Sequence, residues 1–451
     1  MHIKKQHWFI SSLHSGVDYV IMLLAFAAAI FCRFDSQDAF TYLHLFTALI
    51  LIASLSVPVL LFISGMYSIK HRPYGASRIV TYTTLALMLF LLAVLLLSFI
   101  MQTQMIGRGV VILSCSFAFS SLLLHHYIIR KLYQSRYESI AVLFSTTDEE
   151  LRFKQEFSKR LNIDYTLQIN NGEDVIKLDQ TKLARVHKIV CSNTILHDYS
   201  DELSQLQTNL IPIVPLVSLY EDYEQRCPLD AISSQWFIEL SQHEERFYKL
   251  KLKRLIDLVI ALPLLILSTP LLALLAVLIK LSSKGPALFT QERLGEFGKP
   301  FIIYKLRTMT TDAEDAGPQW SQKNDPRVTF IGRLLRLLKL DEIPQLYNVV
   351  KGDMSFIGPR PERPEFDNLL KKHFPYFEKR LLIRPGISGW AQIHQSRSES
   401  IDDSQRKLEY DLYYLKHANI MLDIFIIVDS IRLIFIENLL VSKLKFKRDT
   451  H

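Results

Sequence analysis

The sequence predicts a mixed-class membrane protein, with an N-terminal bundle of transmembrane helices, a small α/β domain and a further C-terminal domain. First, 49% of the 451 residues are hydrophobic and the mean hydropathy is +0.16, which is too apolar for an ordinary soluble chain. Second, four apolar stretches near the N-terminus have about the 20-residue length that crosses a bilayer. Third, short β-rich runs alternate with polar helical stretches from about residue 138 to 240.

The bundle is predicted over residues 1–135, and Asp18 interrupts its first apolar stretch. The four stretches lie at about 17–34, 43–63, 79–101 and 110–129. Basic residues cluster before the first stretch, between the second and third, and after the fourth: Lys4, Lys5, Lys70, Arg72, Arg78, Arg130, Lys131 and Arg136. Because loops rich in Lys and Arg stay in the cytoplasm, both ends of the bundle are expected to face it.

Residues 136–245 are predicted to form a small cytoplasmic α/β domain of Rossmann-like type. Its strands are expected in SIAVLFS, RVHKIVCS and IPIVPLVS. A dinucleotide-binding domain of this type needs a glycine-rich GxGxxG turn after its first strand. Ser145, Thr146 and Thr147 stand there instead. The sequence therefore argues against nucleotide binding in this domain.

A fifth apolar run, residues 258–279, has basic residues at both ends. If it crossed the membrane, one basic cluster would lie on the disfavoured side, and the residues after it would be separated from cytoplasmic nucleotides. Pro263 and Pro270 lack an amide donor and would allow the helix to enter the membrane and turn back. A proline-kinked span fits the pattern equally well.

Chemically informative motifs are concentrated between residues 285 and 394. They include YKLRTM, KLDEIPQLYNVVKGDMSFIGPRPE and RPGISGWAQIH. The pair Asp341-Glu342 follows a basic amphipathic segment that contains Arg333 and Arg336, and it precedes a proline and the GDMSFIGPRPE loop. Carboxylates, cations and a rigid turn are thus expected to gather near one membrane surface.

Several cations in these motifs are suited to phosphate, in line with a net charge of +7. Lys305 and Arg307 alternate along a predicted strand, which places both side chains on one face. Arg336 is the stronger phosphate-binding residue and Arg333 the weaker, with contact to lipid headgroups as the alternative. Arg360, fixed between two prolines, fits a phosphate contact or a structural salt bridge.

These motifs closely resemble those of the bacterial sugar transferase family, the polyprenyl-phosphate hexose-1-phosphate transferases, in the long form with an N-terminal four-helix membrane bundle. The resemblance implies a monotopic, α-rich catalytic domain over residues 246–451, with a re-entrant membrane helix broken at Pro270. It implies that Asp341 attacks a UDP-sugar to form a covalent sugar-phosphoryl aspartate, and that Glu342 holds Mg²⁺. Sequence alone leaves these two roles interchangeable.

The resemblance also supplies a set of substrate-binding residues. They are Lys305, Arg307, Arg333, Arg336, Arg360, Arg384, Gly386 and Gln392. The last three lie in RPGISGWAQIH, for which the alternative interpretation is a tight turn capped by a buried tryptophan. Lys339 departs from the serine that is frequent in the family, and Ser-Thr-Pro replaces the commoner Ser-Pro break in the membrane helix. Neither departure removes a reactive group.

The expected reaction transfers a hexose 1-phosphate, of glucose or galactose, from a UDP-sugar to undecaprenyl phosphate and releases UMP. It would initiate exopolysaccharide, capsule or O-antigen synthesis at the bacterial cytoplasmic membrane, with the catalytic domain in the cytoplasm. The expected partners are the two substrates, membrane lipids and a second copy in a homodimer. Nucleic acid is not expected, because the sequence has no recognition motif for it.

Two rival functions remain to be tested against this expectation. One is a catalytically inactive membrane scaffold or regulator of polysaccharide assembly, which the presence of both Asp341 and Glu342 disfavours. The other is a polytopic lipid transferase with its site between spanning helices, which requires facing carboxylates inside the membrane. It is disfavoured because Asp18 stands alone among the apolar stretches.

Overall fold

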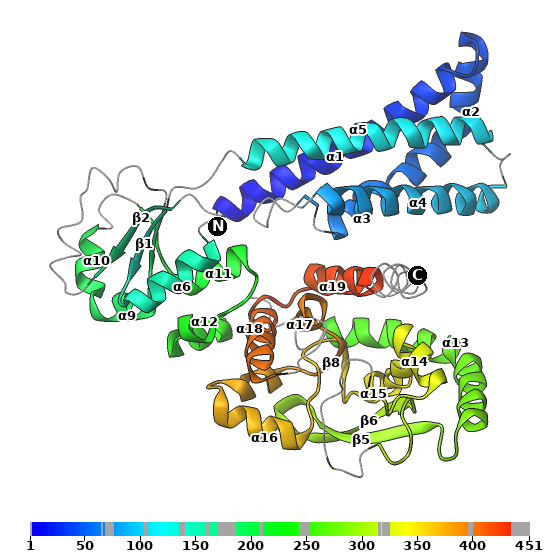
Figure 1. The fold of residues 1–451 in the computed structure, drawn as a ribbon. Coiled ribbons are helices and arrows are strands. Elements are labelled where there is room, and N and C mark those ends of the chain that lie inside the picture. Colours follow the sequence, from blue (N-terminus) through cyan, green and yellow to red (C-terminus); the bar gives the residue numbers. More distant parts are fainter. Residues whose placement is uncertain are drawn as a thin grey trace, which may run out of the picture. The chain divides into compact units, whose positions relative to one another are not determined.

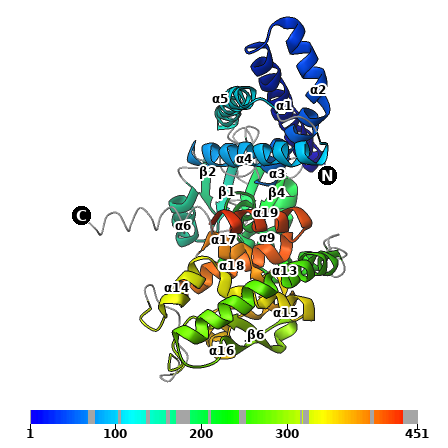
Figure 2. The same cartoon turned by 90° about the vertical axis from the view of Figure 1, so that its right-hand side faces the viewer.

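The structure is a computed structural model whose elements form two compact units, Met1–Glu224 and Gln225–His451 (Figure 1 and Figure 2). The residues that it describes are 2–64, 66–67, 76–102, 106–134, 140–157, 163–169, 186, 188–206, 211–242, 252–313, 317, 325–395 and 400–433. Three of the predicted cytoplasm-facing cations, Lys70, Arg72 and Arg136, lie outside these residues, as do the side chains of Lys4, Lys5 and Arg78.

Five apolar helices form the N-terminal bundle. They are α1 (His2–Phe31), α2 (Ser36–Ser54), α3 (Ser56–Ile63), α4 (Ala76–Ile100) and α5 (Arg108–Gln134). Since α2 and α3 follow each other directly, they make one segment of membrane-spanning length. The bundle thus has four candidate spans, at Ser12–Phe31, Ser36–Phe62, Ile79–Ile100 and Arg108–Leu132, and this confirms the four predicted from the sequence.

The bundle has a mainly apolar core and an apolar outer surface, although a few polar side chains such as Asp18 and His126 are buried in it. Phe26, Phe46 and Phe90 are almost fully buried in its core, and the rings of Phe26 and Phe90 meet edge to face at 6.2 Å between centroids. Large apolar side chains such as Leu24 and Leu96 are exposed on its outer surface. Helices that are apolar on every face fit a lipid surrounding, because the hydrocarbon core accepts such side chains.

A four-stranded parallel sheet follows the bundle. It contains β1 (Ile140–Phe144), β2 (Ile163–Gln168), β3 (Lys188–Cys191) and β4 (Ile213–Pro215), in the order β2-β1-β3-β4. Its described helices are α6 (Thr147–Phe157), α9 (Asn193–Asp198), α10 (Ser200–Leu206) and α11 (Leu216–Tyr223). The predicted alternation of strands and helices is therefore present.

Every residue of β1 is buried, because helices cover both faces of this sheet. Ala141 and Leu143 pack with residues of α9 and α10, whereas Val142 and Phe144 pack with residues of α6 and α11. Central strands of parallel sheets are continuous apolar runs for this reason.

The second unit is rich in short helices around two small sheets. It contains η2 (Leu229–Ala231), α12 (Ser234–Gln242), α13 (Lys253–Ser282), β5 (Leu288–Leu294), η4 (Glu296–Gly298), β6 (Pro300–Leu306), α14 (Phe330–Leu337), η5 (Leu340–Glu342), α15 (Gln345–Lys351), β7 (Ser355–Ile357), α16 (Pro364–His373), η6 (Phe377–Leu382), β8 (Gly386–Ser388), α17 (Trp390–His394), α18 (Ile401–His417) and α19 (Ile420–Arg432). Strands β5 and β6 are antiparallel, and β7 and β8 are parallel. Residues of α13, β6 and α15 share an apolar core.

Helix α13 is the fifth helix of membrane-spanning length and composition, and most of its apolar side chains are exposed. It contains Pro263 and Pro270, and Figure 1 shows it bent between two arms. The hydroxyls of Ser268 and Thr269 both donate to the carbonyl oxygen of Leu265, at 3.1 and 2.8 Å. Hydroxyl bonds from Ser and Thr to the carbonyl groups of the preceding helical turn favour bending of a helix.

The first arm of α13 is held to the rest of its unit by polar contacts. Arg254 donates to the carbonyl oxygens of Val349 and Val350, at 2.5 and 2.9 Å. Asp257 accepts from the hydroxyl of Ser355 and the amide of Phe356, both at 3.0 Å. The start of the membrane helix is thereby tied to α15 and β7, which flank the carboxylates described next.

Candidate active site

The carboxylates Asp341 and Glu342 lie on a short turn of 3₁₀ helix, η5, that follows the basic helix α14. Lys339 separates the two elements and adopts a left-handed backbone conformation, with φ 56° and ψ 20°. This conformation, uncommon for a residue other than glycine, turns the chain sharply so that both carboxylates point inward. Each of them is only 8% exposed.

Two cations converge on Glu342. Nζ of Lys305 and Nη2 of Arg360 each lie 3.1 Å from the same oxygen, Oε1. Burial by itself raises the pKa of Glu342, but the charges of Lys305 and Arg360 outweigh it and hold this pKa well below its ordinary value. Glu342 is therefore ionised and fixed in orientation.

Asp341 has the opposite electrostatic environment. Burial, and next the negative charge of Glu342, raise the pKa of Asp341, against the weaker pull of Lys305, Lys339 and Arg336. Its Oδ1 is buried and has no hydrogen-bond partner among the described residues. A buried polar atom without a partner is costly unless a ligand supplies the missing contact. This oxygen is thus suited to meet a cation or a substrate.

Arg360 is positioned from several sides. Its Nη1 donates to Oε1 of Gln392 at 3.3 Å, so the loop of residues 359–362 (the PRPE loop) and α17 meet beside Glu342. Nη2 of Arg380 donates to the backbone carbonyl oxygen of Arg360. The charge of Glu342 is the main reason why the pKa of Arg360 is raised above its ordinary value. Two predicted substrate-binding residues, Arg360 and Gln392, are thus brought to the carboxylate pair Asp341 and Glu342, called the dyad below.

Arg336 and Arg333 lie on the same helix but in different surroundings. Nε of Arg336 donates to the hydroxyl of Thr308 at 2.8 Å, and its charge acts on Asp341. Arg333 is exposed. Of the two, Arg336 is the one that the structure brings toward the dyad, and Arg333 is accessible to phosphate or lipid headgroups.

Two other predicted substrate-binding residues, Arg307 and Arg384, lie in contacts of their own. Arg307 donates to the carbonyl oxygens of Ser283 and Lys284, at 2.8 and 2.7 Å, and so binds the end of α13. Nε of Arg384 lies 3.2 Å from Oε2 of Glu296. Pro270 is exposed on α13.

Gly386 is required by a close approach of two backbones. A Cβ atom at this position would lie 2.1 Å from the amide nitrogen of Gly358, where β8 passes β7. Trp390 follows, 2% exposed, and its indole nitrogen donates to the carbonyl oxygen of Gln225 at 2.9 Å. The tight turn with a buried tryptophan, the alternative interpretation of this motif, is therefore present.

Sequence reasoning did not find the buried charges behind Arg360. Arg380 lies 3.2 Å from Asp411 and 3.8 Å from Glu362, and Lys407 pairs with Glu362. These residues come from η6, α18 and the PRPE loop, and no local pattern joins them. Thr308, which accepts from Arg336, was missed for the same reason.

The dyad fits a hard divalent cation. Mg²⁺ prefers oxygen ligands and is commonly bound through one or two carboxylates together with substrate phosphates. Asp341 and Glu342 supply two adjacent carboxylates, and the buried Oδ1 of Asp341 has no hydrogen-bond partner among the described residues. The donor set therefore suits Mg²⁺ better than a metal that prefers nitrogen or sulfur.

Comparison with known proteins places this geometry in a family. The model of the family described as "Bacterial sugar transferase" matches residues 248–437, which include the whole dyad region. The chain is 40% identical over 181 residues to a UDP-glucose:undecaprenyl-phosphate glucose-1-phosphate transferase of Caulobacter vibrioides. The aligned residues make up 40% of this chain and 68% of the relative.

Two longer relatives extend the comparison. The chain is 44% identical over 183 residues to a UDP-N-acetylgalactosamine-undecaprenyl-phosphate N-acetylgalactosaminephosphotransferase of Aeromonas hydrophila, and this alignment covers 41% of the chain and 43% of the relative. It is 33% identical over 273 residues to a UDP-glucose:undecaprenyl-phosphate glucose-1-phosphate transferase of Escherichia coli, and that alignment covers 59% of the chain and 53% of the relative. The chain thus spans about half the length of these two relatives.

Proposed function

The chain belongs to the bacterial sugar transferase family, and we propose that it transfers a hexose 1-phosphate from a UDP-sugar to undecaprenyl phosphate and releases UMP. The observation that carries this proposal is the buried Oδ1 of Asp341, which has no hydrogen-bond partner among the described residues and lies beside Glu342. The names of the three relatives, all undecaprenyl-phosphate sugar-phosphate transferases, support the same reaction class.

In the first half-reaction, a carboxylate oxygen of Asp341 attacks the β-phosphorus of the UDP-sugar. The bond between that phosphorus and the oxygen bridging to the α-phosphate breaks, and this oxygen leaves as part of UMP. The sugar phosphate stays on Asp341 as an acyl phosphate. Attack needs the ionised carboxylate, and positive charge that arrives with the substrate would lower the pKa of Asp341, which burial and Glu342 raise.

In the second half-reaction, a phosphate oxygen of undecaprenyl phosphate attacks the same phosphorus. The bond between phosphorus and the Asp341 oxygen breaks, which restores the carboxylate and yields undecaprenyl diphosphate sugar. The two displacements share one phosphorus and one nucleophile, so the scheme is ping-pong.

Charge compensation is the main catalytic requirement, because the nucleotide sugar, the carrier phosphate and Asp341 are all anions. Mg²⁺ bound to the diphosphate would neutralise part of this charge, and Glu342 with Asp341 would hold it. Lys305 and Arg360 fix Glu342, and Arg336 adds positive charge on the Asp341 side. Cations held in place before the reaction stabilise a charged transition state without reorganising.

We place the reaction at the bacterial cytoplasmic membrane, with the dyad on the cytoplasmic side. Five helices suited to a bilayer support a membrane location, and α13 precedes the strand β6, which carries Lys305. A soluble UDP-sugar and a lipid-embedded carrier meet only at a membrane surface. The product would start a surface polysaccharide. The relatives are named for glucose and N-acetylgalactosamine, so both sugars belong in the test with galactose.

The test follows nucleotide release from membranes that contain the full chain, with Mg²⁺, undecaprenyl phosphate and a panel of UDP-sugars. UMP release with one sugar, its loss in Asp341→Asn and its retention in Asp402→Asn are expected. Asp402 is an exposed acid on α18 and gives a matched control. Without carrier, wild type should release about one UMP per chain, as a covalent intermediate requires.

Other outcomes have defined meanings. Release of UDP would replace the proposal with ordinary glycosyl transfer. Continued UMP release by Asp341→Asn would remove Asp341 from the nucleophile role. An absence of nucleotide release with every sugar would favour the scaffold function.

A further inference from the structure

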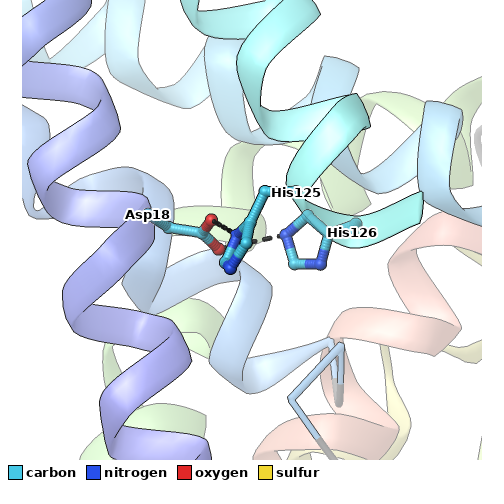
Figure 3. Close-up of side chains that lie close together, drawn as sticks. All are labelled: Asp18, His125 and His126. Carbon is cyan, nitrogen blue, oxygen red and sulfur yellow. Dashed lines mark hydrogen bonds and ion pairs between the residues drawn. The ribbon is translucent and has the colours of Figure 1, made fainter. Parts of the chain in front are cut away.

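The membrane bundle contains a group of possible metal ligands that the transferase reaction does not use. Asp18 of α1 faces His125 and His126 of α5 (Figure 3). Nδ1 of His125 lies 2.6 Å from Oδ1 of Asp18, and Nε2 of His126 lies 3.0 Å from Oδ2. Within the part of the chain that the structure describes, it is the one group of three or more His, Cys, Asp or Glu side chains whose ligand atoms converge, all within 4.8 Å.

The two histidines reach one carboxylate in different ways. Consecutive residues of a helix point about 100° apart, so His125 and His126 do not share a face. His125 uses Nδ1 and His126 uses Nε2, and Figure 3 shows both rings turned toward Asp18. The arrangement therefore offers two nitrogens and a carboxylate from two directions around one point.

Two further side chains, Tyr67 and His14, lie next to this group of possible ligands. The hydroxyl of Tyr67 donates to Oδ2 of Asp18 at 2.5 Å and so orients the carboxylate, as the hydrogen-bond partners of metal ligands commonly do. His14 precedes Asp18 by one helical turn, and its ring centroid lies 5.6 Å from that of His125. A third imidazole is thus close to the group.

The position of Asp18 in a membrane span makes the group costly. Asp18 is fully buried within the span Ser12–Phe31. Asp18 is the one carboxylate within the four apolar stretches, and the side chains of His125, His126 and Tyr67 surround it. A divalent cation held by the carboxylate and the two imidazoles would neutralise this buried charge.

We propose that Asp18, His125 and His126 bind a divalent transition metal of the zinc class, which ties α1 to α5. Mixed imidazole and carboxylate ligands suit zinc-class metals, whereas Mg²⁺ and Ca²⁺ prefer oxygen alone. Tetrahedral zinc with bonds of about 2.0–2.2 Å places its ligand atoms about 3.4 Å apart. The observed separations of 2.6 and 3.0 Å are shorter, so small side-chain rotations would open the site. Water or His14 would fill the fourth position.

The test uses the full chain in lipid nanodiscs, purified with an affinity tag that contains no histidine. Metal is first removed with a chelator. Zn²⁺ is then returned in the presence of excess Mg²⁺, because Mg²⁺ occupies sites made of oxygen alone. Bound zinc is counted by elemental analysis. Wild type should hold one zinc per chain more than His126→Gln. His44→Gln, which changes an exposed histidine of α2, should match wild type.

Two further readouts distinguish a metal site from a hydrogen-bonded network. Co²⁺ should give wild type the strong visible absorption of tetrahedral cobalt, and His126→Gln should lose it. Asp18→Asn, which keeps the shape of the side chain, should weaken zinc binding by about tenfold or more. Chelation should lower the melting temperature of wild type but not that of Asp18→Asn.

Equal zinc in wild type and His126→Gln, or no retained zinc in wild type, would overturn the proposal and leave a hydrogen-bonded network. If neither variant folds, the zinc count and the cobalt spectrum of wild type decide the question by themselves. UMP release by the same preparations is scored separately, because the metal site does not depend on the proposed transfer reaction.

Discussion

Arg380 donates a hydrogen bond to the backbone carbonyl oxygen of Arg360, so one buried arginine holds the loop that presents another. Arg380 is 2% exposed, and its guanidinium also faces Asp411 and Glu362. Arg360 in turn binds Glu342 of the dyad. Arg380 is therefore a positioning residue that acts on the site through Arg360.

Arg380→Gln should lower both stability and activity. The change leaves the buried Asp411 and the partly buried Glu362 short of a cation, and breaking a buried ion pair costs about 3–5 kcal/mol. UMP release should fall by at least about tenfold, about 1.4 kcal/mol of transition-state stabilisation, because Arg360 loses its support. Melting temperature and initial rates measure the two effects. Arg406→Gln, an exposed arginine of α18, is the matched control.

A double-mutant cycle separates positioning from a purely structural role. If Arg380 acts through Arg360, the variant with both changes should be no less active than Arg360→Gln alone. Losses that add would show that Arg380 acts on the reaction by another route. A lowered melting temperature with unchanged rates would leave it a structural residue.

Because of Glu362, the free energy of unfolding of the second unit, Gln225–His451, should fall as the pH becomes acidic. Burial alone raises its pKa, but Lys407 and Arg380 hold the pKa at about 2, below the ordinary 4.5. A carboxylate whose pKa is lower in the folded state stabilises the fold above the ordinary pKa. This shift corresponds to about 3 kcal/mol at neutral pH, lost as the pH falls from about 4.5 toward 2.

Glu362→Gln removes this contribution. Its melting temperature should lie below that of wild type at pH 7, and the difference should shrink as the pH is lowered toward 3. Glu365→Gln, a change at a carboxylate that is 55% exposed, should follow wild type at every pH. A constant difference between Glu362→Gln and wild type would show that the charge of Glu362 is not the cause.

Local sequence pattern was enough for the membrane spans and for part of the site. The four spans follow from apolar length, and Asp341 and Glu342 meet a cation-rich environment as the flanking motifs predict. Lys305 and Arg307 diverge because a spacing of two keeps side chains on one face only while the strand continues, and β6 ends at Leu306. Arg307 therefore reaches the end of α13.

Partners that are distant in the sequence could not be predicted. Asp18 meets His125 across 107 residues, and Arg380 meets Asp411 from a separate helix. A buried charge indicates that some partner exists, but only tertiary packing selects which one. The bundle cluster and the support of Arg360 were missed for this reason.

Lys339 should set the acid limb of the rate profile. Burial and then Glu342 raise the pKa of Asp341, whereas the positive charge of Lys339 lowers it. Lys339→Gln removes that charge, so the pKa of Asp341 should rise and the acid limb of kcat/KM should move to higher pH. Lys339→Arg keeps the charge and should leave the limb in place.

A limb that stays fixed in Lys339→Gln would mean that Asp341 does not titrate in the free enzyme over this range. A limb that moves equally in Lys339→Arg would assign the effect to the left-handed backbone at this position instead of to charge. Initial rates with limiting UDP-sugar, measured in steps from pH 5 to 8, separate these outcomes.

The bent helix α13 should return to the side of the membrane from which it enters. Straight, its 30 residues would be about 45 Å long and would cross the hydrocarbon core. Pro263, Pro270 and the hydroxyl bonds to Leu265 favour the bend. In a chain without other cysteines, Gln235→Cys and Lys284→Cys should both react with a membrane-impermeant maleimide from the same side.

Replacing both prolines by alanine restores two amide donors and should straighten α13. Lys284→Cys should then become reactive from the opposite side, whereas Gln235→Cys, which precedes the helix, should not change. Reaction of the two cysteines from opposite sides in the chain with native prolines would establish a kinked span. That result would also separate the residues after α13 from cytoplasmic UDP-sugar, and the dyad would have to meet its nucleotide on the other side of the membrane.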